Sequence, residues 1–323
     1  MSESNQTRLK NVRGVGSTRF SHVMSTLSQA NEPLDMLFNM SAEEIKKKFN
    51  LPKNVAEAVA SAFKITPEQA EAEKLASRGI KTLRRGSENY PQHLEQILGD
   101  KAPAVLYAWG NMDLLKKPSV GFCGSRSATD KGIAITEDTA RQIAELGWVV
   151  VSGHARGVDS KAHEMALAYG IGTIIVAPEG ILDFKLRKEL KLIAKSEQVL
   201  IISEFPPNAK WNVGYAMTRN KTIIGLSDAM ILIEARNEGG TFEAGKEALR
   251  LKVPLYVAQY LTTEESSAGN LYFLKRGAKP LRKNKDTERA NIESLKEEVA
   301  KMTKDIGDDM LISVERPQQI MLL

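Results

Sequence analysis

The residues best suited to bind an anion fall in four short clusters: GFCGSR (121–126), SGHARGVDSKAH (152–163), TRNKTII (218–224) and EGGTFEAG (238–245). Amides of glycine-rich turns, serine and threonine hydroxyls and arginine guanidinium groups all bind phosphate. Three of the clusters stand where an apolar run ends and a helical pattern begins. Ligands of an open parallel sheet bind beyond the carboxyl ends of its strands. The clusters therefore predict a phosphate-binding crevice.

The elements that must position these clusters alternate from Ala104 onward. Short apolar runs rich in β-branched residues are separated by amphipathic stretches long enough for crossover helices, which is typical of strands buried on both faces of a parallel sheet. The runs are AVLYAW, SVGFC, WVVVS, GTIIVA, VLIIS, AMILIEA and PLYVA. We predict a doubly wound α/β fold with a mostly parallel sheet, and a long helix from Asp130 to Leu146.

Three segments are expected. Residues 1–85 read as a helical N-terminal domain, with capping-box spacing at Ser41 to Glu44 and at Thr66 to Gln69. Residues 86–285 carry the sheet. Residues 286–323 read as a charged C-terminal helix, over 292–302, and a tail that is too short and too charged for a winged-helix domain.

The first two clusters offer specific anion ligands. Gly124 permits a tight turn, Ser125 can donate a hydrogen bond and Arg126 presents a guanidinium fork; alternatively, Gly124 only turns the chain and Arg126 pairs with a surface carboxylate. In the second cluster, Gly153 and Gly157 let amides face a ligand around Arg156. The absence of a GxGxxG motif argues against a dinucleotide site.

Other residues of the second cluster have local structural interpretations. Asp159 is expected to cap the following helix, and His163 to pack inside it. His154 is either ligand-facing or part of the local structure, and we favour the second interpretation.

The third and fourth clusters complete the crevice. Arg219 and Lys221 flank Asn220 in a predicted helix, where they could hold backbone charge, or else form a solvated basic face. The turn Gly239-Gly240-Thr241 predicts an anion nest at a helix N-terminus. Glu243 is either a carboxylate favoured by the helix dipole or a catalytic acid.

Composition narrows the class of protein to which the chain can belong. The chain has 323 residues, a formal charge of +5 and one cysteine, Cys123, so an internal disulfide is excluded. No cysteine and histidine cluster has metal-ligand spacing, and no apolar run is long enough to span a bilayer. We expect a cytoplasmic protein without metal or cofactor and without a membrane role. The modest basic excess permits a nucleic-acid partner without requiring one.

The order of these motifs resembles the DNA-processing protein A family (DprA, also called Smf). The similarity covers 79–281, including GIKTLRRGSENYPQHLEQI and GAKPL, and SGHARGVDSKAHEMAL is its most specific part. The resemblance implies an extended Rossmann-like domain, single-stranded DNA as partner, a homodimer formed through that domain, loading of the recombinase RecA, and no catalysis. The groove residues that it implies are Gly124, Ser125, Arg126, Ser152, Gly153, Arg156, Gly157, Arg219, Asn220, Lys221, Gly240 and Thr241.

The chain also departs from the family's pattern. Lysine stands at 221 where members usually have arginine, which would keep a point charge and lose bidentate recognition. His154 replaces a hydrophobic residue, Phe184-Lys185 stands near the position of a tyrosine-proline pair, and GGTFEAG replaces the usual SGxxxTA. These departures indicate a divergent relative.

Two further segments could meet DNA. Asn11 to Ser17 resembles a helix-hairpin-helix turn, so the N-terminal domain is expected to be SAM-like or helix-hairpin-helix-like, with packing or partner binding as the alternative role. Lys275 to Arg289 holds seven basic and two acidic residues, either a solvated face or an extension of the groove.

Two alternative functions remain open. The altered glycine turn and the unusual chain ends would suit a regulatory, antitoxin-like or DNA-sensing component of a phage-defence system, working with a cognate partner. EGGTFEAG also resembles the signature of the lonely-guy nucleotide phosphoribohydrolases, in which case Glu243 would assist departure of the base.

Overall fold

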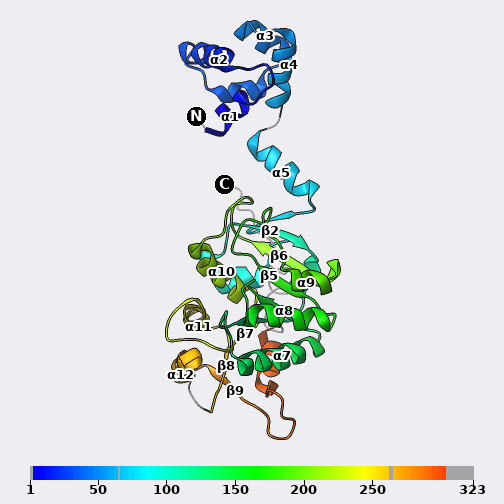
Figure 1. Ribbon diagram of the computed structural model, residues 1–323, viewed down its shortest axis with the longest axis vertical. Coiled ribbons are helices and arrows are strands. Elements are labelled where there is room, and N and C mark those ends of the chain that lie inside the picture. The colour runs from blue at the N-terminus through cyan, green and yellow to red at the C-terminus, as the bar shows by residue number, and fades with distance from the viewer. Residues whose placement is uncertain (1–2, 65, 262–264, 303–323) are drawn as a thin grey trace, which may run out of the picture. The chain divides into compact units, whose positions relative to one another are not determined.

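The computed structural model describes residues 3–64, 66–261 and 265–302, and the chain divides into two compact units, 1–78 and 79–323 (Figure 1). The division falls before the expected boundary at residue 85. The reason is that strand β1 (Lys81–Arg84) pairs with β2 and so belongs to the sheet of the second unit.

The first unit is helical, as predicted. Its elements are α1 (Glu3–Lys10), α2 (Ser17–Gln29), the 3-10 turn η1 (Leu34–Asn39), α3 (Ala42–Phe49), α4 (Lys53–Ala62) and α5 (Pro67–Ser77). The two expected capping boxes are present: Ser41 and Glu44 bond reciprocally at the start of α3, and Thr66 and Gln69 do so at the start of α5. Leu9, Phe49 and Phe63 are fully buried in the core of this unit.

The segment that resembles a helix-hairpin-helix turn joins α1 to α2. Gly14 has φ +91°, and its carbonyl accepts a hydrogen bond of 2.7 Å from Arg19 Nη1. A DNA contact at this turn stays a prediction.

The second unit is built on one nine-stranded sheet in the order β1-β2-β6-β5-β4-β3-β7-β8-β9. β1 and β2 are antiparallel to each other, β2 is antiparallel to β6, and the remaining pairs are parallel. The strands after β1 are β2 (Val105–Gly110), β3 (Ser119–Cys123), β4 (Val149–Ser152), β5 (Thr173–Val176), β6 (Val199–Ser203), β7 (Ala229–Leu232), β8 (Leu255–Ala258) and β9 (Lys279–Leu281). The doubly wound α/β fold is confirmed; the short edge strands β1 and β9 were not predicted.

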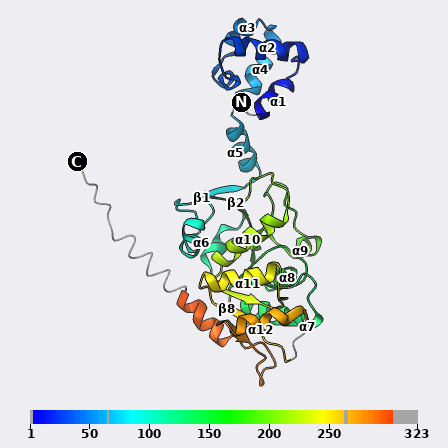
Figure 2. The same ribbon diagram turned by 90° about the vertical axis from the view of Figure 1, so that its left-hand side faces the viewer.

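Helices cover both faces of this sheet. Strand residues alternate between two cores, so that Val149 and Val151 belong to one and Val150 to the other. The first face is covered by α6 (Gln92–Leu98), α10 (Val213–Gly225), α11 (Gly240–Arg250) and α12 (Ala268–Leu274), which lie toward the viewer in Figure 2. The second is covered by α7 (Asp130–Glu145), α8 (Val158–Ala168) and a helix over 293–302.

The shorter helical elements lie in the connections of the second unit. They are α9 (Lys188–Ile193), η2 (Gly99–Lys101), η3 (Met112–Lys116), η4 (Ser196–Gln198) and η5 (Glu265–Ser267). Of these, α9 packs against α8.

The C-terminal segment is part of the second unit. The expected helix over 292–302 is observed over 293–302, and Ile292, Leu295 and Val299 are buried in the same core as α7 and α8. Residues 286–302 therefore do not form a separate segment, because their apolar side chains need the sheet face for burial. The expected tail lies outside the described residues.

Strand order fixes where a ligand can bind. β3 lies between β4 and β7, so the loops after β3 and β7 lead to helices on opposite faces of the sheet. In such sheets the crevice at this switch point is the ligand site. Within the described ranges, no helix combines the length and apolar character needed to cross a membrane, and no group of three metal-ligating side chains occurs.

Candidate functional site

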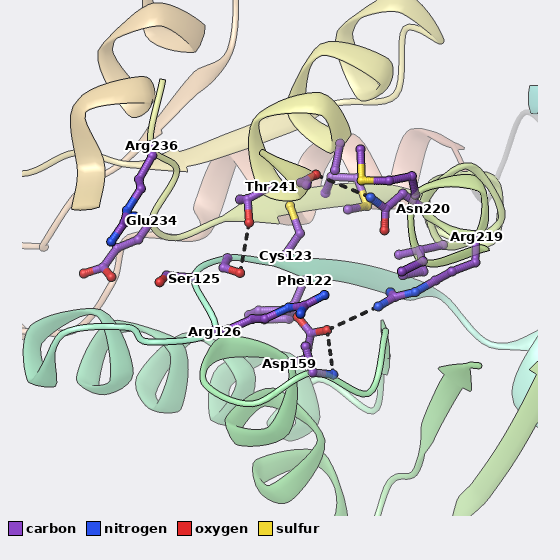
Figure 3. Close-up of a pocket in the computed structure, with 18 of the residues that line it drawn as sticks. Phe122, Cys123, Ser125, Arg126, Asp159, Arg219, Asn220, Glu234, Arg236 and Thr241 are labelled. Atoms are coloured by element: carbon purple, nitrogen blue, oxygen red, sulfur yellow. Dashed lines mark hydrogen bonds and ion pairs between the residues drawn. The ribbon is translucent and has the colours of Figure 1, made fainter. Parts of the chain in front are cut away.

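A cavity of about 350 Å³ lies at the switch point, between the loops that follow β3, β4 and β7 and the side of α10. It brings together seven of the residues selected from the sequence. They are Gly124, Ser125, Arg126, Arg219, Asn220, Gly240 and Thr241. Figure 3 shows several of them around the opening.

Hydrogen bonds hold the loops of this cavity together. Thr241 Oγ1, at the start of α11, donates to the carbonyl of Gly124 over 3.0 Å, which joins the loop after β7 to the loop after β3. Asn220 Nδ2 donates to the carbonyl of Gly240 over 3.4 Å, which ties α10 to the same turn. The predicted ligand residues therefore also form the frame of the crevice.

Arg219 is buried, so its interpretation as part of a solvated basic face is wrong. Its side chain is 8% exposed and its Nη2 lies 3.9 Å from Asp159 Oδ2. Burial lowers the pKa of Arg219, and the Asp159 carboxylate opposes that shift; an arginine stays charged in proteins nonetheless. Its buried Nε has no hydrogen-bond partner. A charged donor with unused capacity thus stands at the wall of the cavity.

Two further cations face the same space. The side chains of Arg126 and Arg236 are exposed at the cavity, and neither has a hydrogen bond or ion pair with the described residues. Figure 3 shows Arg219 reaching toward the Asp159 carboxylate, and the charge of Arg126 lies close enough to influence Arg219. The exposed charges of Arg126 and Arg236 favour an anionic group at the opening of the cavity.

Three carboxylates also line the cavity, and two of them have partners within the fold. Asp159 accepts a hydrogen bond of 3.3 Å from the amide of Ala155 and faces Arg219. Glu234 accepts hydrogen bonds from Thr129 N over 3.1 Å and from Thr129 Oγ1 over 2.5 Å. Glu238 alone is exposed and has no partner among the described residues.

Ser152, Gly153 and Gly157 shape the crevice from outside its lining. Ser152 is fully buried and its Oγ donates to the carbonyl of Phe122 over 2.7 Å, so it links β4 to β3 and is not free to bind a ligand. A Cβ on Gly153 would lie 1.9 Å from Arg219 Nη1. Gly157 has φ +75°, and a Cβ there would lie 2.3 Å from the carbonyl oxygen of Ser125. These positions require their small residues for packing.

Three predicted residues lie around the cavity without lining it. Arg156 and Lys221 are exposed, and neither has a hydrogen bond or ion pair within the described part of the chain. Gly239 is the exposed N-cap of α11, with φ +94°. Contact of these residues with a ligand larger than the cavity stays a prediction.

The titratable residues near the crevice have structural roles. His154 Nε2 accepts a hydrogen bond of 3.1 Å from the amide of Arg187, and its ring packs on Phe184. Burial, with smaller contributions from His163 and Arg187, lowers the pKa of His154 to about 3. His163 is fully buried and bonds the carbonyl of Gly153 over 2.5 Å. These contacts agree with the interpretation of both histidines as structural.

Two acidic residues of the clusters, Asp159 and Glu243, lie in the first turns of their helices. Asp159 is not the N-cap of α8, because Gly157 occupies that position and Asp159 lies in the first turn. Glu243 lies in the first turn of α11, outside the cavity lining, and its Oε1 is 3.0 Å from Lys246 Nζ. Cys123 does line the cavity, but burial raises the pKa of its thiol to about 12, which leaves it protonated at neutral pH.

Sequence reasoning missed several lining residues. Trp211, Met217, Glu234, Arg236 and Glu238 all line the cavity. A signal existed for two of them, because Arg236 and Glu238 directly precede the glycine turn. Trp211 and Met217 could not be assigned, since they reach the cavity only through the way α10 crosses the sheet.

The fold and the crevice define a Rossmann-like α/β protein whose candidate ligand site, at the topological switch point, presents exposed arginines. A family model described as DNA recombination-mediator protein A matches residues 81–291. The chain belongs to this family, as the resemblance predicted.

Curated relatives agree with the assignment. DNA processing protein DprA of Bacillus subtilis is 29% identical over 206 residues, 63% of this chain and 69% of that protein. DNA processing protein DprA of Streptococcus pneumoniae is 31% identical over 199 residues, 61% of this chain and 69% of that protein. Their names describe DNA processing and no enzymatic reaction.

Two solved structures are similar. DNA processing protein A from Streptococcus pneumoniae has a TM-score of 0.59 at 25% identity, covering 87% of this chain and 95% of that chain. DNA processing protein A from Helicobacter pylori, described for its single-stranded DNA binding mode, has a TM-score of 0.55 at 30% identity, covering 70% of this chain and 96% of that chain.

Proposed function

We propose that the crevice binds the sugar-phosphate backbone of single-stranded DNA, and that the protein acts in DNA processing and recombination. The observation that carries the proposal is the convergence of Arg126 and Arg219 beside the start of α11. Guanidinium groups and amides at a helix N-terminus recognise phosphate. The Helicobacter pylori relative, which is described as binding single-stranded DNA, supports the choice of ligand.

The charges around the cavity favour contact with a DNA backbone over binding of a free nucleotide. Asp159 is paired with Arg219, and Glu234 is held by the amide and hydroxyl of Thr129, so Arg126 and Arg236 are the lining cations without an internal partner in the described part of the chain. Exposed Arg156 and Lys221 lie next to lining residues in the chain and extend the cationic surface beyond the cavity. A polymer can contact them together with the cavity, whereas a mononucleotide cannot.

The test is fluorescence anisotropy with labelled single-stranded DNA, double-stranded DNA and RNA of one length, at about 50 and 200 mM salt. We expect single-stranded DNA to bind most tightly and its affinity to fall steeply with salt, because each phosphate contact releases counterions. Equal, salt-insensitive affinities for all three polymers would contradict the proposal.

The same proposal includes two partners. A second copy of the chain is expected to bind through the Rossmann-like unit, and the complex with DNA is expected to load a RecA-type recombinase. Sedimentation analysis tests the first expectation. Stimulation of RecA assembly on single-stranded DNA that is covered by a competing binding protein tests the second.

A further inference from the structure

One wall of the crevice is apolar and exposed. Trp211, in the loop before α10, is 48% exposed, and Met217, on α10, is 37% exposed. Both line the same cavity as Arg126. Large apolar side chains beside a phosphate site have no role in holding phosphate, but an aromatic ring is a platform on which a nucleobase stacks.

A carboxylate stands at the same opening. Glu238 lines the cavity and, unlike Asp159 and Glu234, has no hydrogen-bond or ion-pair partner in the described part of the chain. A free carboxylate repels phosphate. Glu238 therefore opposes binding of a DNA backbone unless its carboxylate contacts a part of the ligand other than the phosphate.

Met217 and the turn that carries Glu238 meet in one corner of the cavity, and Trp211 lines the same cavity. Met217 Sδ lies 3.5 Å from where a Cβ of Gly240 would stand, and Asn220 Nδ2 bonds the carbonyl of Gly240. The turn 238–240 is thereby held against α10. One cavity of about 350 Å³ thus holds two kinds of group. Cations come from the loops after β3 and β7, and polar and apolar groups come from this corner.

We propose that this corner is a nucleobase subsite that prefers guanine, with Trp211 and Met217 as the apolar wall and Glu238 as the acceptor. This inference rests on the proposed function. Guanine is the one common base whose Watson-Crick edge carries two adjacent N–H donors, N1–H and the N2 amino group, which match the two oxygens of a carboxylate. Unpaired bases are read on that edge in single strands.

The experiment uses the full chain and oligo-dT in which one central nucleotide is guanine, adenine or hypoxanthine. Hypoxanthine keeps N1–H and lacks the N2 amino group. We expect the guanine oligomer to bind about tenfold more tightly than the adenine oligomer, with hypoxanthine between them. Glu238→Gln should abolish this order, whereas Glu243→Gln, which changes a carboxylate in the first turn of α11 outside the cavity, should keep it.

The stacking platform has its own readout. Trp211→Ala should weaken binding of the guanine oligomer and leave binding of an oligomer abasic at that position unchanged, and Trp211→Phe should restore most of the loss. Quenching of tryptophan emission by the guanine oligomer should be smaller in Trp211→Phe than in the parent protein.

The outcomes are distinguishable. If Glu238→Gln tightens all oligomers equally, Glu238 only repels phosphate and the inference is wrong. If all oligomers bind equally to the parent protein, the inference fails while the proposed function stands. If none of them binds, both fail.

Discussion

Nη2 of Arg219 on α10 lies 3.9 Å from Oδ2 of Asp159 on α8, and both side chains are only 8% exposed. The two helices cover opposite faces of the sheet, so the pair connects the two layers across the carboxyl ends of the strands. It also orients the guanidinium toward the cavity that Arg126 enters from the loop after β3.

Removing the carboxylate of this pair should destabilise the fold. Asp159→Asn leaves the buried Arg219 charge without its counter-ion, and breaking one partner of a buried pair costs about 3 kcal/mol. We expect the free energy of unfolding in urea to fall by about that amount. Asp113→Asn, which removes an exposed ion pair with Lys116, is the control and should leave the free energy of unfolding nearly unchanged.

The close approach of Arg219 to Gly153 predicts a second effect. Gly153→Ala places a Cβ 1.9 Å from Arg219 Nη1, so the guanidinium must leave its position beside Asp159. We expect affinity for single-stranded DNA to fall at least tenfold, measured by anisotropy. Lys116→Ala, which changes an exposed side chain outside the cavity lining, should bind as the parent does. Unchanged binding by Gly153→Ala would remove Arg219 from the proposed contact.

Single cations should contribute unequally to DNA binding. Arg126→Ala removes a lining charge and should lower the slope of log affinity against log salt by about 0.7, the value for one phosphate contact on a single strand. Lys221→Ala, outside the cavity, should have a smaller effect, and Lys116→Ala should have none. If Arg126→Ala and Lys221→Ala both bind normally, the proposed groove does not exist.

The half-buried imidazole of His154 predicts a pH dependence of stability. Its pKa is lowered to about 3 in the folded protein, so between that value and about 6.5 the unfolded chain binds a proton that the folded protein does not. The contribution of the neutral His154 imidazole to the free energy of unfolding is fully present above pH about 6.5. It is lost as pH falls toward 3, at about 1 kcal/mol per pH unit. The melting temperature should therefore fall as the pH is lowered from 6 to 4.

His154→Leu is the test of that assignment. It should flatten the decline of melting temperature between pH 6 and pH 4. Part of the slope should remain, because burial also lowers the pKa of His163. An identical pH profile in the variant would show that His154 is not the group responsible.

The sequence by itself determined the elements and their order. Apolar runs such as WVVVS and AMILIEA can be buried on both sides only inside a covered parallel sheet, and the capping boxes at Ser41 and Thr66 mark helix starts through bonds that span three residues. These signals are local, so they can be read without coordinates. They also placed Gly124, Arg126 and Thr241 at strand and helix ends, and so at one crevice.

Tertiary structure decided what each polar residue does there. Ser152 bonds a carbonyl thirty positions away, and Arg219 meets Asp159 only because α10 and α8 approach each other across the sheet edge. The edge strands β1 and β9 exist because β2 and β8 offer them hydrogen bonds. Burial and pairing between distant segments leave no periodic signal in the chain, which is why the buried role of Arg219 and the positions of Trp211 and Met217 at the cavity emerged only from the folded arrangement.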